Sequence, residues 1–361
     1  MNRVSLILLA GLLGFIGLDL LAFHSSLYPY WVATDSSTGY VETVLQHERI
    51  REKRGPNQIL GIGDSRMALV AKTANALTAE TGYQFGTIAV AGTTPRCWYY
   101  MLRAADPEAN RYKAIVIGIE SYNDDEILED YAERESDLNY VIHQLRLSDL
   151  AEFSQSYRSP ARQWRAASGI ALKGLVYKRD LQDFLLHPIQ RIQSVRLSWR
   201  DSHIWFYDFR TDERSLTGLS IDWPNRKLTV PAGTPADMEA ALRSRLVEPL
   251  PPQTGRHSAY LKYWLGRIRD HYRGSKTQIV FARLPRAAWI RPDLPVNPQS
   301  SVHELDREPG VALLPEELFN ELETPERFHD QVHMNQGGLD RFTEILARKI
   351  REVLEPISDA L

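Results

Sequence analysis

Residues 59–65 read Ile-Leu-Gly-Ile-Gly-Asp-Ser, a short apolar run that ends in a glycine and two polar residues. Beyond this run, apolar side chains recur at helical spacing at Met67, Val70, Ala74 and Leu77. The pattern predicts a buried strand, a tight turn and a helix, with Ser65 at the turn. Ser65 would then lie at the carboxyl edge of a sheet, which is where α/β proteins bind their ligands.

Similar units follow along the chain. Short apolar or β-rich runs at residues 85–90, 114–119 and 278–281 predict three further strands. Between and after them, apolar residues at helical spacing predict helices, most clearly at 261–272 and 339–353. Continuous apolar strands that alternate with helices indicate a parallel sheet covered on both faces. The fold class is therefore α/β, with a central parallel sheet in one large domain over residues 57–361.

Two segments depart from this pattern. Residues 25–56 are mostly polar with a short helical pattern, and we interpret them as a stalk or a peripheral helix. From about residue 130 to residue 252 the alternation of strands and helices breaks down. We interpret this stretch as an insertion that caps or borders the site, with its arginines Arg191, Arg196 and Arg200 on a solvated face.

The N-terminus predicts a membrane anchor over residues 1–24. Arg3 precedes an almost uninterrupted apolar run from Val4 to Phe23, which as a helix spans a hydrocarbon core of about 30 Å. The alternative is a cleavable signal peptide, but no small-x-small cleavage pattern follows the run. Because positive charge stays on the cytoplasmic side, we expect a single-pass inner-membrane protein with a cytoplasmic N-terminus and a periplasmic soluble domain.

Composition excludes several classes of function. Of 361 residues, 43 are Lys or Arg and 46 are Asp or Glu, so the chain has no cationic excess for binding nucleic acid. Cys97 is the only cysteine, which rules out an intrachain disulfide. The ten histidines are dispersed in the sequence, and we expect neither a metal site nor a cofactor.

The residue types needed to activate a serine are present. A serine hydroxyl needs a base to take its proton, and the base needs an acceptor that holds its tautomer. Asp330 and His333 supply these two groups in the string Asp-Gln-Val-His, shortly before the last predicted helix. His329 is a competing base, which we set aside in favour of His333. The predicted catalytic triad is Ser65, His333 and Asp330.

Four blocks of the chain resemble the SGNH (GDSL-like) hydrolase and acyltransferase superfamily. Gly63-Asp64-Ser65 looks like the first block and Asp330-x-x-His333 like the last. Gly92 is similar to the glycine of the second block and Asn123 to the asparagine of the third. The resemblance implies a three-layer α/β/α flavodoxin-like fold, and an oxyanion hole made by Ser65, Gly92 and Asn123. The alternatives are a turn glycine at Gly92 and a solvated residue or helix cap at Asn123.

Arg66 follows the serine in place of the leucine of the GDSL subset, after a membrane anchor. This combination resembles the envelope-anchored branch that O-acetylates alginate and related polysaccharides beside a multi-spanning membrane acyltransferase. The resemblance implies serine-dependent acyl transfer to a polysaccharide or another acylated glycan, with that membrane protein as acyl donor. An acetyl esterase of the same fold and a non-catalytic envelope protein that binds polysaccharide or a membrane partner are the alternatives.

Three residues are candidates for binding the substrate. Arg66 lies beside the serine, while Trp205 and Tyr207 belong to an aromatic cluster in the insertion. Aromatic rings of this kind stack on sugar faces, although they also pack into protein cores.

Overall fold

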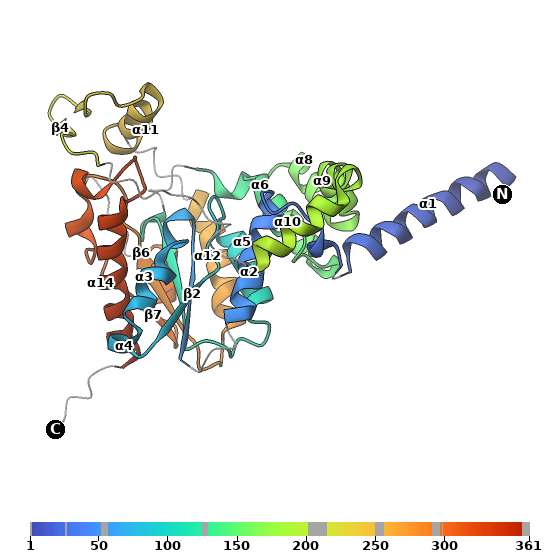
Figure 1. Ribbon diagram of the computed structural model, residues 1–361, viewed down its shortest axis with the longest axis horizontal. Helices are drawn as coiled ribbons and strands as arrows, with labels where there is room; N and C mark the ends of the chain where they lie inside the picture. Colours follow the sequence, from blue (N-terminus) through green and yellow to red (C-terminus); the bar gives the residue numbers. More distant parts are fainter. Residues whose placement is uncertain are drawn as a thin grey trace. The chain divides into compact units, whose positions relative to one another are not determined.

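Five parallel strands form the central sheet, as the computed structural model in Figure 1 shows. The strands are β1 (Gln58–Ile62), β2 (Gln84–Thr87), β3 (Ala114–Ile119), β6 (Gln278–Arg283) and β7 (Val311–Leu313). They lie in the order β2-β1-β3-β6-β7, and every pairing is parallel. The structure describes residues 2–25, 27–51, 57–124, 129–200, 215–249, 256–290, 297 and 299–355.

The residues of β1 and β3 are buried along their whole length, because helices cover both faces of the sheet. Alternate residues of a strand face opposite sides. Ile59 and Val116 therefore share one core with Val70 of α3 and Phe342 of α14, while α12 lies on the other face (Figure 1). The helices around the sheet are α3 (Val70–Ala76), α4 (Thr78–Thr81), α11 (Ala236–Leu246), α12 (Arg256–His271), α13 (Ser301–Leu305) and α14 (Gln336–Leu354).

The expected strands are present with some changes of length. The strand at 114–119 has the expected bounds, the one expected at 85–90 ends at Thr87, and the one expected at 278–281 continues to Arg283. The helix expected directly after the serine begins later. Ser65–Met67 forms one 3-10 turn, and α3 starts only at Val70.

The chain divides into two compact units. Unit 1 comprises residues 1–50, 100–105 and 131–205, and unit 2 comprises 51–99, 106–130 and 206–361. The sheet belongs to unit 2, as does the antiparallel hairpin of β4 (Ser220–Asp222) and β5 (Lys227–Thr229). The predicted insertion at 130–252 is thus shared between the two units. Helix α5 (Pro95–Ala105) runs from unit 2 into unit 1.

Unit 1 is helical in the residues that the structure describes. Its remaining helices are α1 (Arg3–Phe23), α2 (Ser37–Arg51), α6 (Ser136–Val141), α7 (Leu150–Gln155), α8 (Pro160–Ala171), α9 (Gly174–Leu186) and α10 (Pro188–Arg200). Helix α2, in the segment expected as a stalk or peripheral helix, buries Val41 and Leu45 completely. Arg191 is also buried and pairs with Asp180, so the expectation of a solvated face was wrong for Arg191, whereas Arg196 and Arg200 are exposed.

Helix α1 is long and apolar enough to cross a membrane, a property that cleaved signal sequences share. Most of it is exposed, but its last turn packs into unit 1. The carboxylate of Asp19 accepts a hydrogen bond of 2.8 Å from the backbone N–H of Gly174, at the start of α9. Phe23 stacks on Tyr177 with 5.3 Å between the ring centroids. The end of α1 is therefore part of the packed structure of unit 1.

Candidate active site

Ser65 stands where β1 ends, in a turn that requires close backbone approach. A Cβ atom at Gly63 would lie 2.8 Å from Cγ of Met67 and 2.9 Å from the carbonyl oxygen of Gly118. Only glycine fits this position. Asp64 then caps the 3-10 turn, because its carboxylate accepts the backbone N–H of Arg66 at 2.9 Å. The turn leaves Ser65 half-buried at the carboxyl edge of the sheet.

The structure brings Ser65, His333 and Asp330 together in one chain of hydrogen bonds, although Ser65 and His333 are 268 residues apart. Ser65 Oγ lies 2.8 Å from His333 Nε2, and His333 Nδ1 lies 2.8 Å from Asp330 Oδ2. The loop that holds the last two residues closes on itself, since Phe328 pairs with Met334 in an antiparallel bridge. Asn335 then caps α14 by accepting the N–H of Gly338.

The environment of Asp330 favours its ionised form. Burial alone would raise the pKa of this carboxyl, but the hydrogen bond and charge of His333 and the backbone N–H groups of Val332 and His333 outweigh it and lower the pKa. An ionised carboxylate only accepts hydrogen bonds, so Nδ1 of His333 must carry a proton. Nε2 then holds the lone pair that can take the proton of Ser65.

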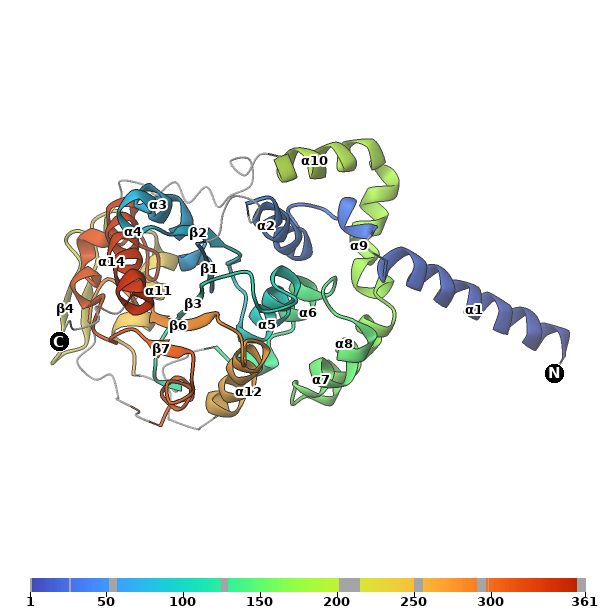
Figure 2. The same cartoon turned by 90° about the horizontal axis from the view of Figure 1, so that it is seen from below.

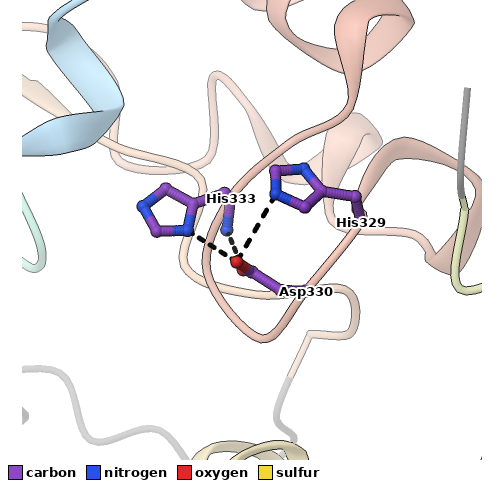
Figure 3. A group of neighbouring side chains, drawn as sticks. All are labelled: His329, Asp330 and His333. Atoms are coloured by element: carbon purple, nitrogen blue, oxygen red, sulfur yellow. Dashed lines mark hydrogen bonds and ion pairs between the residues drawn. The ribbon is translucent and has the colours of Figure 1, made fainter. Parts of the chain in front are cut away.

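His329 shares the carboxylate of Asp330, as Figure 3 shows. Its Nε2 lies 3.5 Å from Asp330 Oδ2, the oxygen that also contacts His333. The two imidazole rings are nearly parallel, with centroids 5.8 Å apart. His329 was set aside on sequence grounds, although Glu326 lies three residues before it. The closed loop instead brings the next residue, Asp330, within reach of its side chain.

The same three residues could in principle hold a metal ion. His329, Asp330 and His333 each offer a ligand atom, and these atoms lie within 4.8 Å of one another. The sequence interpretation of dispersed histidines thus overlooked one close pair. A metal there would compete with the proton on Nδ1 of His333, because that nitrogen cannot serve both.

Arg66 belongs to a second cluster of charged side chains. Its guanidinium pairs with Asp64 at 2.6 Å and approaches Glu120 at 3.8 Å, and Glu120 also pairs with Arg245 of α11. Burial opposes ionisation of Asp64 and Glu120, but the arginine charges outweigh it and lower the pKa of both carboxyls. Arg66 is only 8% exposed, so its charge interacts mainly with the carboxylates of Asp64 and Glu120.

The two candidate oxyanion residues lie on loops at the same edge of the sheet. Gly92 has φ of 72°, which favours glycine, and the next residue, Thr93, donates a hydrogen bond of 3.2 Å to the carbonyl oxygen of Gly63. Asn123 follows β3, which pairs with β1, and it is 2% exposed. The neighbouring Tyr122 hydroxyl donates to carbonyl oxygens of β6 and of Leu314, which follows β7.

A small pocket opens beside the serine. Its cavity volume is about 20 Å³, and it is partly open to solvent. Its lining residues are Ser65, Arg66, Leu69, His329, His333, Met334 and Leu339. The polar groups are those of the hydrogen-bonded chain and its neighbours, and the rest of the wall is apolar. Such a wall accommodates a short apolar group next to Ser65 Oγ.

Part of the predicted insertion borders this region. The backbone N–H of Leu216 donates to the carbonyl oxygens of Pro325 and Phe328, in the segment that leads to Asp330.

Sequence reasoning missed Glu120 and Arg245. Glu120 could have been found, because it directly follows a predicted strand, whereas nothing in the local sequence marks Arg245.

Trp205 and Tyr207, the aromatic candidates for substrate binding, lie outside the described residues. The remaining candidates, Ser65, Arg66, Gly92, Asn123, Asp330 and His333, all belong to unit 2. The interpretation of the site depends on this geometry, because no protein-family model and no curated protein matches the chain.

Proposed function

We propose that the chain is a serine acyltransferase of the SGNH type, anchored in the inner membrane with its catalytic unit in the periplasm. One observation carries the proposal: Ser65, His333 and Asp330 form a continuous hydrogen-bonded chain at the carboxyl edge of a parallel sheet. A nucleophile, a base and an orienting acid in this order are the parts that acyl transfer requires.

The fold supports the resemblance to this superfamily. If the separate β4–β5 hairpin is left out of the numbering, the five sheet strands follow the order 2-1-3-4-5. This order defines flavodoxin-like sheets, in which ligands bind where the strand order reverses. In this chain the reversal lies between β1 and β3, and the loops after these strands carry Ser65 and Asn123.

The proposed reaction has two halves. Ser65 Oγ attacks the carbonyl carbon of a donor ester while His333 Nε2 takes the hydroxyl proton, and Asp330 stabilises the imidazolium. The ester C–O bond then breaks, and His333 returns the proton to the leaving alcohol. In the second half an acceptor hydroxyl gives its proton to His333 and attacks the acyl carbonyl on Ser65, the acyl–Oγ bond breaks, and His333 returns the proton to Ser65 Oγ. Water in place of the acceptor gives ester hydrolysis.

The pocket and the anchor suggest the substrates. Leu69, Met334 and Leu339 form an apolar wall of limited size beside the serine, which suits a short acyl group such as acetyl. Helix α1 would hold the enzyme at the membrane, where an exported polysaccharide emerges and a multi-spanning acyltransferase can supply the acyl donor. We therefore propose O-acetylation of an envelope or exported polysaccharide, with no cofactor.

The test of this function is covalent labelling. A fluorophosphonate phosphorylates only activated serines, so the full chain in detergent should be labelled at Ser65, as identified by peptide mass spectrometry. Ser258 is an internal control, because its hydroxyl donates a hydrogen bond of 2.7 Å to the carboxylate of Asp124 and not to an imidazole. Ser258 should stay unmodified. No labelling of Ser65 in folded protein would overturn the proposal.

Asn123→Ala tests the proposed oxyanion hole. Loss of one oxyanion donor lowers kcat by about 10²–10³, and we expect a decrease of that size in hydrolysis of p-nitrophenyl acetate. Asn225→Ala, an exposed asparagine next to the β4–β5 hairpin, is the matched control and should keep the wild-type rate. If Asn123→Ala also keeps it, another group stabilises the oxyanion, and Ser121 is the first to examine.

The orientation of the anchor has its own test. Alkaline phosphatase fused after Leu361 is active only outside the cytoplasm, and we expect full activity in this fusion. Green fluorescent protein exported in unfolded form does not fluoresce, so the same junction should give a dark fusion. The reverse pattern would place the catalytic unit in the cytoplasm and contradict the proposed localisation.

A further inference from the structure

Unit 1 carries exposed apolar side chains that unit 2 largely lacks. Among its described residues, unit 2 exposes only Tyr263 and Ile290 of the large hydrophobic types. Outside α1, unit 1 exposes such residues at several places, including α9 and the corner between α9 and α10. We call the following set the apolar patch: Leu27, Leu175, Leu185, Leu186 and Ile189, which are 53%, 54%, 68%, 74% and 70% exposed. Contiguous exposed apolar surface usually marks a binding surface.

The patch adjoins the last turn of α1, the part of this helix that packs against α9. Gly174, whose N–H binds Asp19 of α1, directly precedes Leu175. Leu27 follows α1 after four residues, and the next segment contacts α9 again, because Trp31 stacks on Phe184 at 5.5 Å. Figure 2 shows α9 running across the base of α1. A bilayer that contains α1 would therefore meet α9 first.

The composition of α9 fits such a surface. Leu175 and Leu186 lie about three helical turns apart on one face, since eleven residues make slightly more than three full turns. Between them the same face presents the exposed side chains of Lys178, Arg179 and Gln182. Long cationic side chains cover apolar surface with their stems and place their charges at lipid headgroups.

The acidic residues of α9 do not oppose this contact. Asp180 and Asp183 are both paired with Arg191, and Asp180 also accepts a hydrogen bond from the Tyr28 hydroxyl. The exposed face of α9 is therefore cationic and apolar at once, which is the composition of helices that lie in the plane of anionic membranes.

We infer that the apolar patch of unit 1 lies in the outer-leaflet interface of the bilayer that α1 spans. Helix α9 and the α9–α10 corner would enter the headgroup region, with the leucines roughly 5–10 Å deep. The occupant of the patch is thus lipid, with anionic headgroups at Lys178 and Arg179. This inference rests on the membrane anchoring in the proposed function, and it adds a second membrane contact that fixes the orientation of unit 1.

Depth-dependent quenching tests the inference in the full chain. The native Cys97 is buried, so single cysteines at Leu186 or Ile189 can carry an NBD fluorophore, with the unaltered chain reporting background labelling. The chain is reconstituted singly into nanodiscs of phosphatidylethanolamine and phosphatidylglycerol. We expect blue-shifted emission at both positions and loss of most of the intensity with lipids spin-labelled near the headgroup. The matched control, Tyr263→Cys, should emit as in water.

A second variant removes the apolar character itself. Leu185→Glu combined with Leu186→Glu changes two highly exposed side chains, so we expect the fold to persist, as circular dichroism can verify. The NBD group at Ile189 should then lose its blue shift and its quenching by lipid. Quenching that persists in this variant would overturn the role of the leucines.

A probe in α1 distinguishes failure of the membrane anchor from failure of the inference about the apolar patch. NBD at Leu13→Cys should be quenched by lipids spin-labelled deep in the acyl chains. If it is not, the membrane anchor itself fails. If Leu13 is deep but Leu186 and Ile189 emit as in water, only the present inference is overturned. Quenching that requires two chains per nanodisc, with crosslinks between Leu186→Cys residues, would assign the patch to a second copy and also overturn it.

Discussion

Ser65→Ala and His333→Ala are each expected to lower kcat for ester turnover by roughly 10⁴–10⁶, and the double variant is expected to be scarcely slower than either single one. The reason is that the serine and the histidine act as one unit. Without the hydroxyl there is no acyl-enzyme, and without Nε2 at 2.8 Å the hydroxyl keeps its proton. Either loss leaves only the oxyanion donors and substrate binding, which give a common residual rate.

Hydrolysis of p-nitrophenyl acetate and acetyl transfer to a soluble glycan acceptor measure this effect. Ser215→Ala, a change of another hydroxyl that is hydrogen-bonded to its neighbour Thr217, is the matched control and should behave like the wild type. Single variants that retain full activity in both assays would end the enzyme hypothesis. The chain would then be better described as an envelope protein that binds polysaccharide or a membrane partner.

Asp330→Asn is expected to lower kcat by about 10⁴ while the fold persists. The amide can still accept the two backbone N–H groups that Oδ1 accepts now. Its NH₂ group would then face Nδ1 of His333, and that nitrogen would have to accept. The proton would move to Nε2, which could no longer take one from Ser65. The rate of p-nitrophenyl acetate hydrolysis measures the loss, and circular dichroism verifies the fold.

The same variant should change how stability depends on pH. The pKa of Asp330 is lowered in the folded chain, so its ionised form stabilises that state. This contribution is present above the unfolded pKa near 3.8 and is lost as the pH falls through the folded pKa. Wild type and Asp330→Asn should therefore differ slightly in melting temperature at neutral pH and converge in acid. Asp340→Asn, at a half-buried carboxylate of α14 that accepts hydrogen bonds from Thr73 and Gln336, is the control for a general effect of removing a charge.

Sequence reasoning worked best where local patterns determine structure. The strand at 114–119 is an unbroken apolar run, and such a run can be buried only between two layers of helices. The two motifs around Ser65 and Asp330 could be assigned to one site because the first follows a predicted strand and the second precedes a predicted helix. Parallel strands bring their carboxyl ends to one edge, so these distant strings meet there.

Contacts that depend on tertiary structure could not be predicted in the same way. Arg245 and Glu120 are paired although they lie 125 positions apart, and no local sequence pattern predicts this contact. Arg191 was expected on a solvated face together with Arg196 and Arg200, yet it is buried where it pairs with the half-buried Asp180. His329 reaches Asp330 only because the loop from Phe328 to Met334 closes, which spacing alone does not reveal.

Because Ser65 and His333 lie far apart in the sequence, the ribosome adds His333 to the chain long after Ser65. At a synthesis rate of roughly 5–20 residues per second, the ribosome adds the 268 residues between them over roughly 15–50 s. Throughout this interval the serine exists without its base, so under the proposed function a chain still being translocated would not attack esters. Chains that end before His333 would stay inactive for the same reason. The proposed catalytic competence would thus coincide with delivery of the C-terminal segment.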